Sequence, residues 1–155
     1  MSRELANPVS PLVVSAQLSL AAEFPDHAQA RIERSWSDWR GRAVEPLVRE
    51  SLARLLPDHG IPAAPVVGGY WTRSNDVEID VVGADREPVA KQLLFLGSIK
   101  WFNKGQFDEH DLVALQRHRD RVTDGPVPLI AISRSGTSAT HVDAAFTPAD
   151  LITAW

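Results

Sequence analysis

The sequence predicts an α/β fold in which a central sheet is flanked by helices. The apolar segments at residues 93–101 and 128–133 are nearly continuous, which is typical of strands buried on both faces. Residues 109–122, which lie between them, have helical spacing, and an apolar helical stripe at residues 42–56 precedes all the strands. The expected order is therefore helix, three strands, helix, strand and helix.

Two helices are expected before the first strand. Residues 28–39 have apolar side chains at steps of four and three, and residues 42–56 have a longer stripe, so each segment is predicted to be helical. Gly41 is expected to separate them. Pro46 falls in the first turn of the second helix, where proline is tolerated. The apolar stripe of this second helix consists of Val44, Leu47, Val48, Leu52 and Leu55.

The remaining elements follow from local signals. Strands are expected at residues 64–73, 78–83, 93–101 and 128–133. Asp108 is a suitable N-cap for the helix at residues 109–122. Thr147 followed by Pro148 favours the start of a short final helix, because a capping residue and a first-turn proline often occur together.

Composition narrows the class of protein. A chain of 155 residues, 44% of them hydrophobic, has room for one domain with a core, and we expect an extension over residues 1–27 and a domain over 28–155. The net charge of −4 argues against unspecific coating of nucleic acid.

The absence of cysteine excludes disulfides and favours the cytoplasm. Residues 9–22 are too short and interrupted for a membrane span.

Two predicted strands bring acids and a lysine together. On a pleated strand alternate residues share a face, so Glu78 and Asp80 are expected to point one way and Ile79 and Val81 the other. By the same rule Ser98 and Lys100 share a face. A carboxylate beside a lysine suits metal-dependent phosphodiester hydrolysis, because the acid can hold Mg²⁺ and the ammonium can stabilise developing negative charge.

The hairpin register tests this arrangement. If Asp80 lies opposite Ser98 in an antiparallel pair, the numbers of paired residues sum to 178. The turn then falls beside Pro88, in a segment rich in turn residues. A shift by one residue would place the two groups on opposite faces and remove the site.

Several short motifs resemble a known family. Gly41-x-x-x-Glu45, Gly69-Tyr70-Trp71-x-Arg73, Glu78-Ile79-Asp80, Gly97-Ser98-Ile99-Lys100-Trp101 and Asp150-Leu151 closely resemble the domain of unknown function 234. The resemblance covers roughly Ile32 to the end of the chain. That domain is found at the C-terminus of archaeal and bacterial AAA+ type ATPases, and it resembles in turn the PD-(D/E)xK nuclease superfamily. The resemblance implies a restriction-endonuclease-like αβββαβ core with a central mixed sheet.

The resemblance also implies roles for individual residues. Asp80 corresponds to the metal-binding aspartate, Lys100 to the catalytic lysine, and Glu45 to the acid of the first helix. Ser98 stands where the second acid of the motif is expected, and a neutral hydroxyl is a weak ligand for Mg²⁺. Glu78 and the carbonyl oxygen of Ile99 are the candidates to compensate.

The same resemblance implies a partner. The chain has no G-x-x-x-x-G-K-[ST] phosphate-binding loop, so the ATPase domain is missing from it, and we expect either a fragment or a gene that begins late. Arginines of the first two helices, and a group at 117, 119 and 121, are candidates for contacts with DNA phosphates. No membrane partner is expected, and a homodimer stays open.

Two functions follow as alternatives. In one, the domain keeps the nuclease fold without turnover and serves in DNA docking or protein contact, insensitive to chelators. In the other, it is an active Mg²⁺-dependent DNA endonuclease in which Asp80, Glu45 and Glu78 hold the metal and Lys100 acts in catalysis. A structural reading is also open, in which the acids line a solvated strand and Lys100 is their ion-pair partner. The tryptophans are expected in the core.

Overall fold

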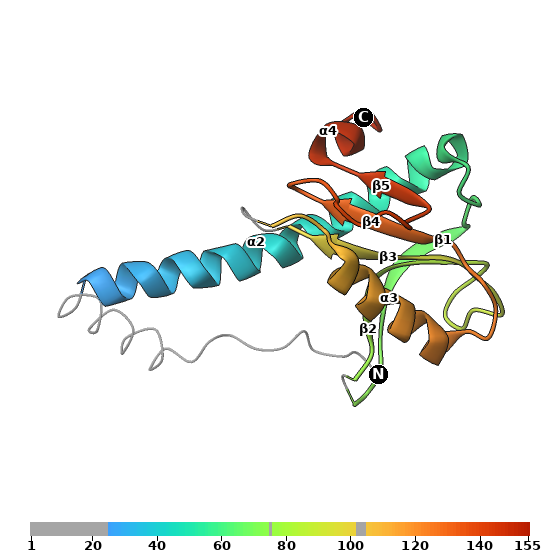
Figure 1. Ribbon diagram of the computed structural model, residues 1–155, viewed down its shortest axis with the longest axis horizontal. Coiled ribbons are helices and arrows are strands. Elements are labelled where there is room, and N and C mark those ends of the chain that lie inside the picture. Colours follow the sequence, from blue (N-terminus) through green and yellow to red (C-terminus); the bar gives the residue numbers. More distant parts are fainter. Residues whose placement is uncertain (1–24, 75, 102–104) are drawn as a thin grey trace, which may run out of the picture. The chain divides into compact units, whose positions relative to one another are not determined.

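The computed structural model describes residues 25–74, 76–101 and 105–155 (Figure 1). The chain divides into two compact units, residues 1–39 and 40–155. Helix α2 (Pro25–Leu55) contributes to both units. The predicted extension over residues 1–27 lies almost entirely outside the described residues, so the boundary after residue 27 stays a prediction.

The second unit contains a five-stranded mixed sheet. Its strands are β1 (Val66–Trp71), β2 (Glu78–Ala84), β3 (Leu93–Lys100), β4 (Leu129–Ser133) and β5 (Ala144–Phe146), and their spatial order is the order of the sequence. The first three strands are antiparallel to one another, and β3, β4 and β5 are parallel. A short 3₁₀ helix, η1 (Leu56–His59), follows α2, while α3 (Glu109–Val122) and α4 (Pro148–Ile152) complete the fold.

Helices cover both faces of this sheet, as the sequence predicts (Figure 1). On one face, Val48 and Leu52 of α2 pack on inward-facing side chains such as Phe95 of β3 and Ile132 of β4. On the other face, Leu112 and Leu115 of α3 pack on a second set, which includes Leu96 and Ala131. Each of these residues is nearly or fully buried, so the two apolar layers supply the main stabilisation of the unit.

The predicted hairpin register is confirmed. Val81 pairs with Gly97, Val82 with Leu96 and Gly83 with Phe95, and each pair of numbers sums to 178. The connection between the strands contains Pro88, in a loop over residues 85–92. The N-cap of α3 is also confirmed, since Asp108 and Asp111 form a reciprocal capping box.

Several details differ from the predictions. The two expected helices are one continuous helix, because Gly41 lowers helical stability only modestly and is not in a left-handed conformation. Leu47, predicted in the apolar stripe, is exposed, while Ser51 is buried and accepts a hydrogen bond of 3.1 Å from Nε1 of Trp155. The short strand β5 was not predicted, since three residues carry little periodic signal.

The expectation that the tryptophans lie in the core is wrong for most of them. Trp101 is half-buried, but the other four have exposed fractions between 57% and 70%. Within the first unit, the rings of Trp36 and Trp39 stack on each other with centroids 5.0 Å apart. Trp155 instead lies under the guanidinium of Arg54, at 3.8 Å from its ring centroid. Periodicity alone cannot distinguish these surface contacts from burial.

Candidate functional site

Strand β2 contains one extra residue at the centre of the predicted site. Gly68 of β1 pairs with Val82 of β2. Tyr70, two residues after Gly68, pairs with Ile79, which lies three residues before Val82, so β2 has one residue more than β1 over this stretch. Such a bulge reverses the alternation of side chains. The expectation that Ile79 and Val81 share a face is therefore wrong, since Ile79 packs in the layer of α3 and Val81 in that of α2.

Arg49 of α2 binds this bulge. Its Nε donates a hydrogen bond of 2.8 Å to the backbone carbonyl of Asp80, and its Nη2 forms an ion pair of 2.8 Å with Oε2 of Glu45, one helical turn earlier. The Arg49 and Glu45 side chains are about one quarter exposed, at 24% and 27%. The guanidinium therefore joins the helix acid to the bulged strand in a partly desolvated place.

Gly69 makes room for the guanidinium. A Cβ atom at this position would lie 2.6 Å from Nη2 of Arg49 and 3.3 Å from the Asp80 carbonyl oxygen. The first of these distances is shorter than any ordinary van der Waals contact, so any other residue would displace the arginine. The adjacent Gly68 is different, because a Cβ there meets nothing within 4 Å.

The Asp80 carboxylate is held by β3. Its Oδ2 accepts a hydrogen bond of 2.7 Å from the Ile99 backbone N–H and one of 3.1 Å from the Ser98 hydroxyl. Burial raises the pKa of Asp80, and the nearby charge of Glu78 adds to this effect, while the two hydrogen bonds and Arg49 oppose it. Ser98 thus acts as a donor to the aspartate.

Glu45 has a similar environment. Burial raises its pKa above the ordinary value, and the charges of Asp80 and Glu78 add to the rise. The ion pair and hydrogen bond with Arg49 oppose it. The negative charges of Glu45 and Asp80 disfavour each other, and Arg49, which binds Glu45 and the backbone of Asp80, keeps the two residues together.

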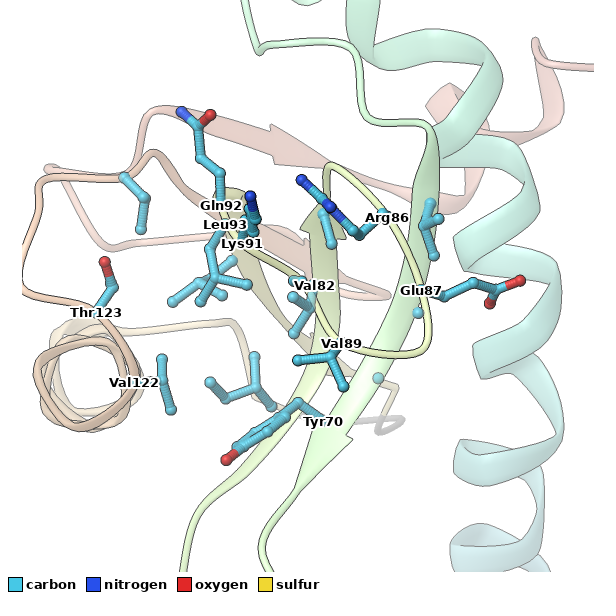
Figure 2. A pocket seen from close by; sticks show the side chains of 18 of the residues that line it. Tyr70, Val82, Arg86, Glu87, Val89, Lys91, Gln92, Leu93, Val122 and Thr123 are labelled. Carbon is cyan, nitrogen blue, oxygen red and sulfur yellow. The ribbon is translucent and has the colours of Figure 1, made fainter.

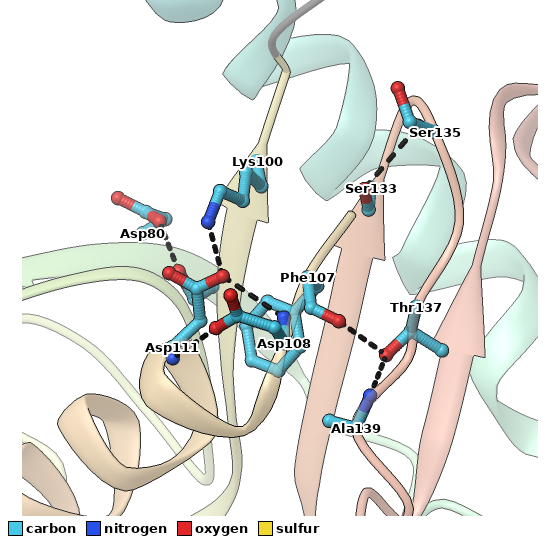
Figure 3. A network of polar contacts seen from close by, with 10 residues as sticks. Asp80, Lys100, Phe107, Asp108, Asp111, Ser133, Ser135, Thr137 and Ala139 are labelled. Carbon is cyan, nitrogen blue, oxygen red and sulfur yellow. Dashed lines mark hydrogen bonds and ion pairs between the residues drawn. The ribbon is translucent and has the colours of Figure 1, made fainter. Parts of the chain in front are cut away.

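Lys100 is directed to a different partner. Its Nζ forms an ion pair with Oδ2 of Asp111, in the first turn of α3, and both side chains are 24% exposed (Figure 3). The same carboxylate accepts a hydrogen bond of 3.0 Å from the backbone N–H of Asp108, so the lysine is attached to the capping box of α3. This ion pair secures the end of β3 to the start of the helix.

The structure thus brings together only some of the predicted site residues. Asp80, Ser98 and Ile99 are in direct contact, and Glu45 joins them through Arg49. Glu78 is exposed at the start of β2. Two contributing residues, Gly69 and Asp111, were not assigned to the site from the sequence. Arg49 was expected only as one of the arginines that could contact phosphates, and its i,i+4 spacing from Glu45 was the available signal for their ion pair.

The donor set does not suit a magnesium ion. Within the described part of the chain, no group of three or more His, Cys, Asp or Glu side chains is arranged to hold a metal. Of the ligands that the sequence suggested, Glu45 is paired with Arg49, and Ser98 directs its proton toward Asp80. Mg²⁺ requires several oxygen ligands with lone pairs directed at one point, and these contacts direct them elsewhere.

A separate cavity of about 930 Å³ lies beside the bulged hairpin (Figure 2). It is bounded by Val66, Gly68 and Tyr70 of β1, by the loop over residues 85–92, and by the end of α3. Neither Asp80 nor Lys100 lines it. This cavity therefore does not coincide with the predicted catalytic residues.

Comparison with known families identifies the chain. A family model for DUF234, described as archaeal and bacterial proteins of unknown function, matches residues 12–112. The chain belongs to this family. The matched residues begin before Ile32 and end at residue 112, whereas the motifs that resemble the family extend from about Ile32 to the end of the chain. No curated protein and no solved structure matches the chain significantly.

Of the helices in the described residues, none has the length and apolar character to cross a membrane.

Proposed function

We propose that this DUF234 domain is a nuclease-like module that does not cleave nucleic acid and instead makes a protein contact. The order helix, three strands, helix and strand, with an acid and a lysine on β2 and β3, supports the kinship with PD-(D/E)xK nucleases. The partner that the resemblance implies is an AAA+ type ATPase domain. A cytoplasmic location belongs to the same proposal.

The contacts of Arg49 are the observation that carries this proposal. A cleaving site of this type needs its acids to gather a divalent cation. Here the guanidinium of Arg49 forms an ion pair with Glu45 and binds the Asp80 carbonyl. The positive charge among these acids therefore belongs to an arginine side chain of the protein. Ser98 supplies no charge to attract a second cation, and Lys100 is engaged by Asp111.

Charge pairing favours a protein over DNA as the partner. DNA binding draws its affinity from arginines and lysines that are available to phosphates. In the described part of residues 40–155, many of these cations are paired with acids of the same unit. The paired cations are Arg49, Arg54, Arg86, Lys100, Arg119 and Arg121. Two members of the predicted phosphate-binding group, Arg119 and Arg121, are among them.

A nicking assay tests the absence of cleavage. Supercoiled plasmid is incubated with Mg²⁺ or Mn²⁺ and with the natural chain, Asp80→Ala or Lys100→Ala. We expect all three proteins to give the same background. Nicking that EDTA stops and that both variants lose would contradict the proposal and support the alternative, an active Mg²⁺-dependent endonuclease.

Two further measurements separate the remaining possibilities. Gel-shift experiments with branched, single-stranded and double-stranded DNA at two salt concentrations are expected to show no specific complex. A specific, salt-sensitive complex would assign the module to DNA docking instead. In the nicking assay, Ser98→Glu is expected to stay inactive because Arg49 still occupies Glu45. Cleavage by this variant would show that the missing acid alone silences the site.

A further inference from the structure

The two edges of the sheet differ in how well they are protected. At one edge, β5 has only three residues and is followed directly by α4, which packs against it. At the other edge, β1 has six residues, none of them charged and none a proline. Proteins usually protect an edge strand with charges, prolines or very short length, because its free backbone groups can pair with another chain. β1 has none of these protections.

The cavity lies along the same strand. Val66, Gly68 and Tyr70 alternate along β1 and line it, so they face one side of the sheet. The Gly68 position is open, since a Cβ atom there meets nothing within 4 Å. A peptide that paired with β1 would therefore place every second side chain on the face of the sheet that bears this cavity, next to its β1 side.

The lining of the cavity has an apolar and a cationic side. Figure 2 shows Tyr70, Val89 and Val122 toward one side, with the nitrogen-bearing ends of Arg86 and Lys91 toward the other. Glu87 also lines the cavity, but its carboxylate points away from these nitrogens (Figure 2). Val89 is 76% exposed at the tip of its loop. Tyr70, which is 42% exposed, lines the same cavity, so two large exposed apolar side chains contribute to one surface.

Lys91 supplies an available charge. Arg86 is paired with Asp85, but Lys91 forms no ion pair with any residue that the structure describes. The loop that carries it is ordered by Asp85, whose Oδ1 accepts hydrogen bonds of 2.9 and 3.1 Å from the backbone N–H groups of Lys91 and Gln92. The bonds from Gln92 and Lys91, together with the hydrogen bond and charge of Arg86, lower the pKa of Asp85 to about 2, so this carboxylate keeps its charge well below neutral pH.

We propose that β1 and this cavity receive an extended, acidic segment of the partner protein, which adds to the sheet as a further strand. Apolar side chains of the segment enter the cavity, and its carboxylates lie at the end near Val66, where the loop presents Lys91. Val66 pairs with Ala84, which immediately precedes that loop. The inference rests on the proposed protein-contact function and names the chemistry of the partner.

A peptide-binding experiment tests the inference on the full chain. The probe is a fluorescein-labelled peptide of alternating threonine and valine that ends in two glutamates, measured by fluorescence anisotropy. Amide chemical shifts report where it binds, and we expect changes along Val66–Trp71. The same peptide with alternate amides N-methylated cannot pair as a strand, and we expect it not to bind.

Matched variants sharpen the test. Gly68→Phe fills the cavity from an open position and is expected to abolish binding without loss of the fold. Gly41→Phe, at another position where a Cβ meets nothing within 4 Å, is expected to bind normally. Lys91→Glu is expected to weaken binding by about ten-fold, because it reverses an exposed charge opposite the glutamates.

Four results would overturn the inference. The N-methylated peptide could bind equally well, or Gly68→Phe could leave binding unchanged. Octanoate could bind in the cavity while the peptide does not, which would mark a site for small amphipathic anions. A dimer that sedimentation detects and Gly68→Phe dissociates would assign β1 to a second copy of the chain. None of these results depends on nicking, so failure here is distinguishable from failure of the proposed function.

Discussion

Two consecutive glycines of β1 face very different surroundings. Gly69 faces the Arg49 guanidinium, the Asp80 carbonyl and the acid of α2, where a Cβ atom would collide. Gly68 faces the cavity, where a Cβ atom would meet nothing. The polar groups on the first side are already paired within the chain, while the second side keeps open space and an available lysine. We therefore infer that the residues that resemble a catalytic site stabilise the fold, and we propose that the side with the cavity is the one that binds a partner.

The largest effect that would test this comparison is expected from Arg49→Met. The variant leaves Glu45 and the Asp80 carbonyl without their partner in a partly buried place, so we expect the free energy of unfolding to fall by about 2–3 kcal/mol. Urea denaturation measures the change. Arg119→Met is the control, because its partner Asp120 is exposed, and we expect a loss of about 0.5 kcal/mol or less. Equal losses would contradict a special role for Arg49.

A smaller effect is expected from the glycines themselves. Gly69→Ala places a methyl group against the guanidinium and should cost about 1–2 kcal/mol of stability. Gly68→Ala has no such contact and should stay within about 0.5 kcal/mol of the natural chain. Thermal unfolding of both variants makes the comparison. If the two alanines were equally tolerated, the arginine would not require the space beside Gly69.

The smallest effect is a change in pH dependence. The folded-state pKa of Asp80 is raised, so the native state binds this proton more tightly than the unfolded chain does. The contribution of Asp80 to stability is thus fully present below its unfolded pKa and is lost as pH rises through the folded value. Asn at position 80 cannot ionise. We therefore expect the free energy of unfolding of Asp80→Asn, relative to that of the natural chain, to increase as pH rises from the unfolded to the folded pKa of Asp80.

Urea denaturation at a series of pH values from about 2 upward, a range that includes the ordinary aspartate pKa of about 3.9, measures this difference. Asp85→Asn is the matched comparison, because hydrogen bonds lower the pKa of Asp85 and its contribution has the opposite sign. Parallel pH profiles for the two variants would argue against the burial of Asp80.

Much of the fold could be predicted from local signals. The hairpin register followed from the requirement that Asp80 and Ser98 meet, together with turn residues around Pro88, and the structure has the same pairing. The cap at Asp108 followed from its side chain alone. Continuity of α2 through Gly41 could not be predicted, because the cost of a helical glycine, about 1 kcal/mol, does not by itself decide whether a helix ends there.

The site was harder to predict, because its decisive contacts join distant segments. The bulge between Ile79 and Val82 depends on how β1 pairs with β2, and no residue of β2 predicts it from the sequence. No sequence motif relates Asp111 to Lys100, although the two side chains form an ion pair across eleven positions of sequence. The cavity beside β1 is formed by a strand, a loop and a helix end that lie far apart in the sequence, so no single motif indicates it.

The guanidinium at the bulge has a consequence for how this domain assembles. A metal ion must be acquired from its surroundings, can dissociate, and competes with other ions of similar radius. Arg49 is synthesised with the polypeptide in a one-to-one ratio and stays charged at any physiological pH. The junction between α2 and β2 can therefore form as soon as the chain folds, whatever the supply of divalent ions in the cell.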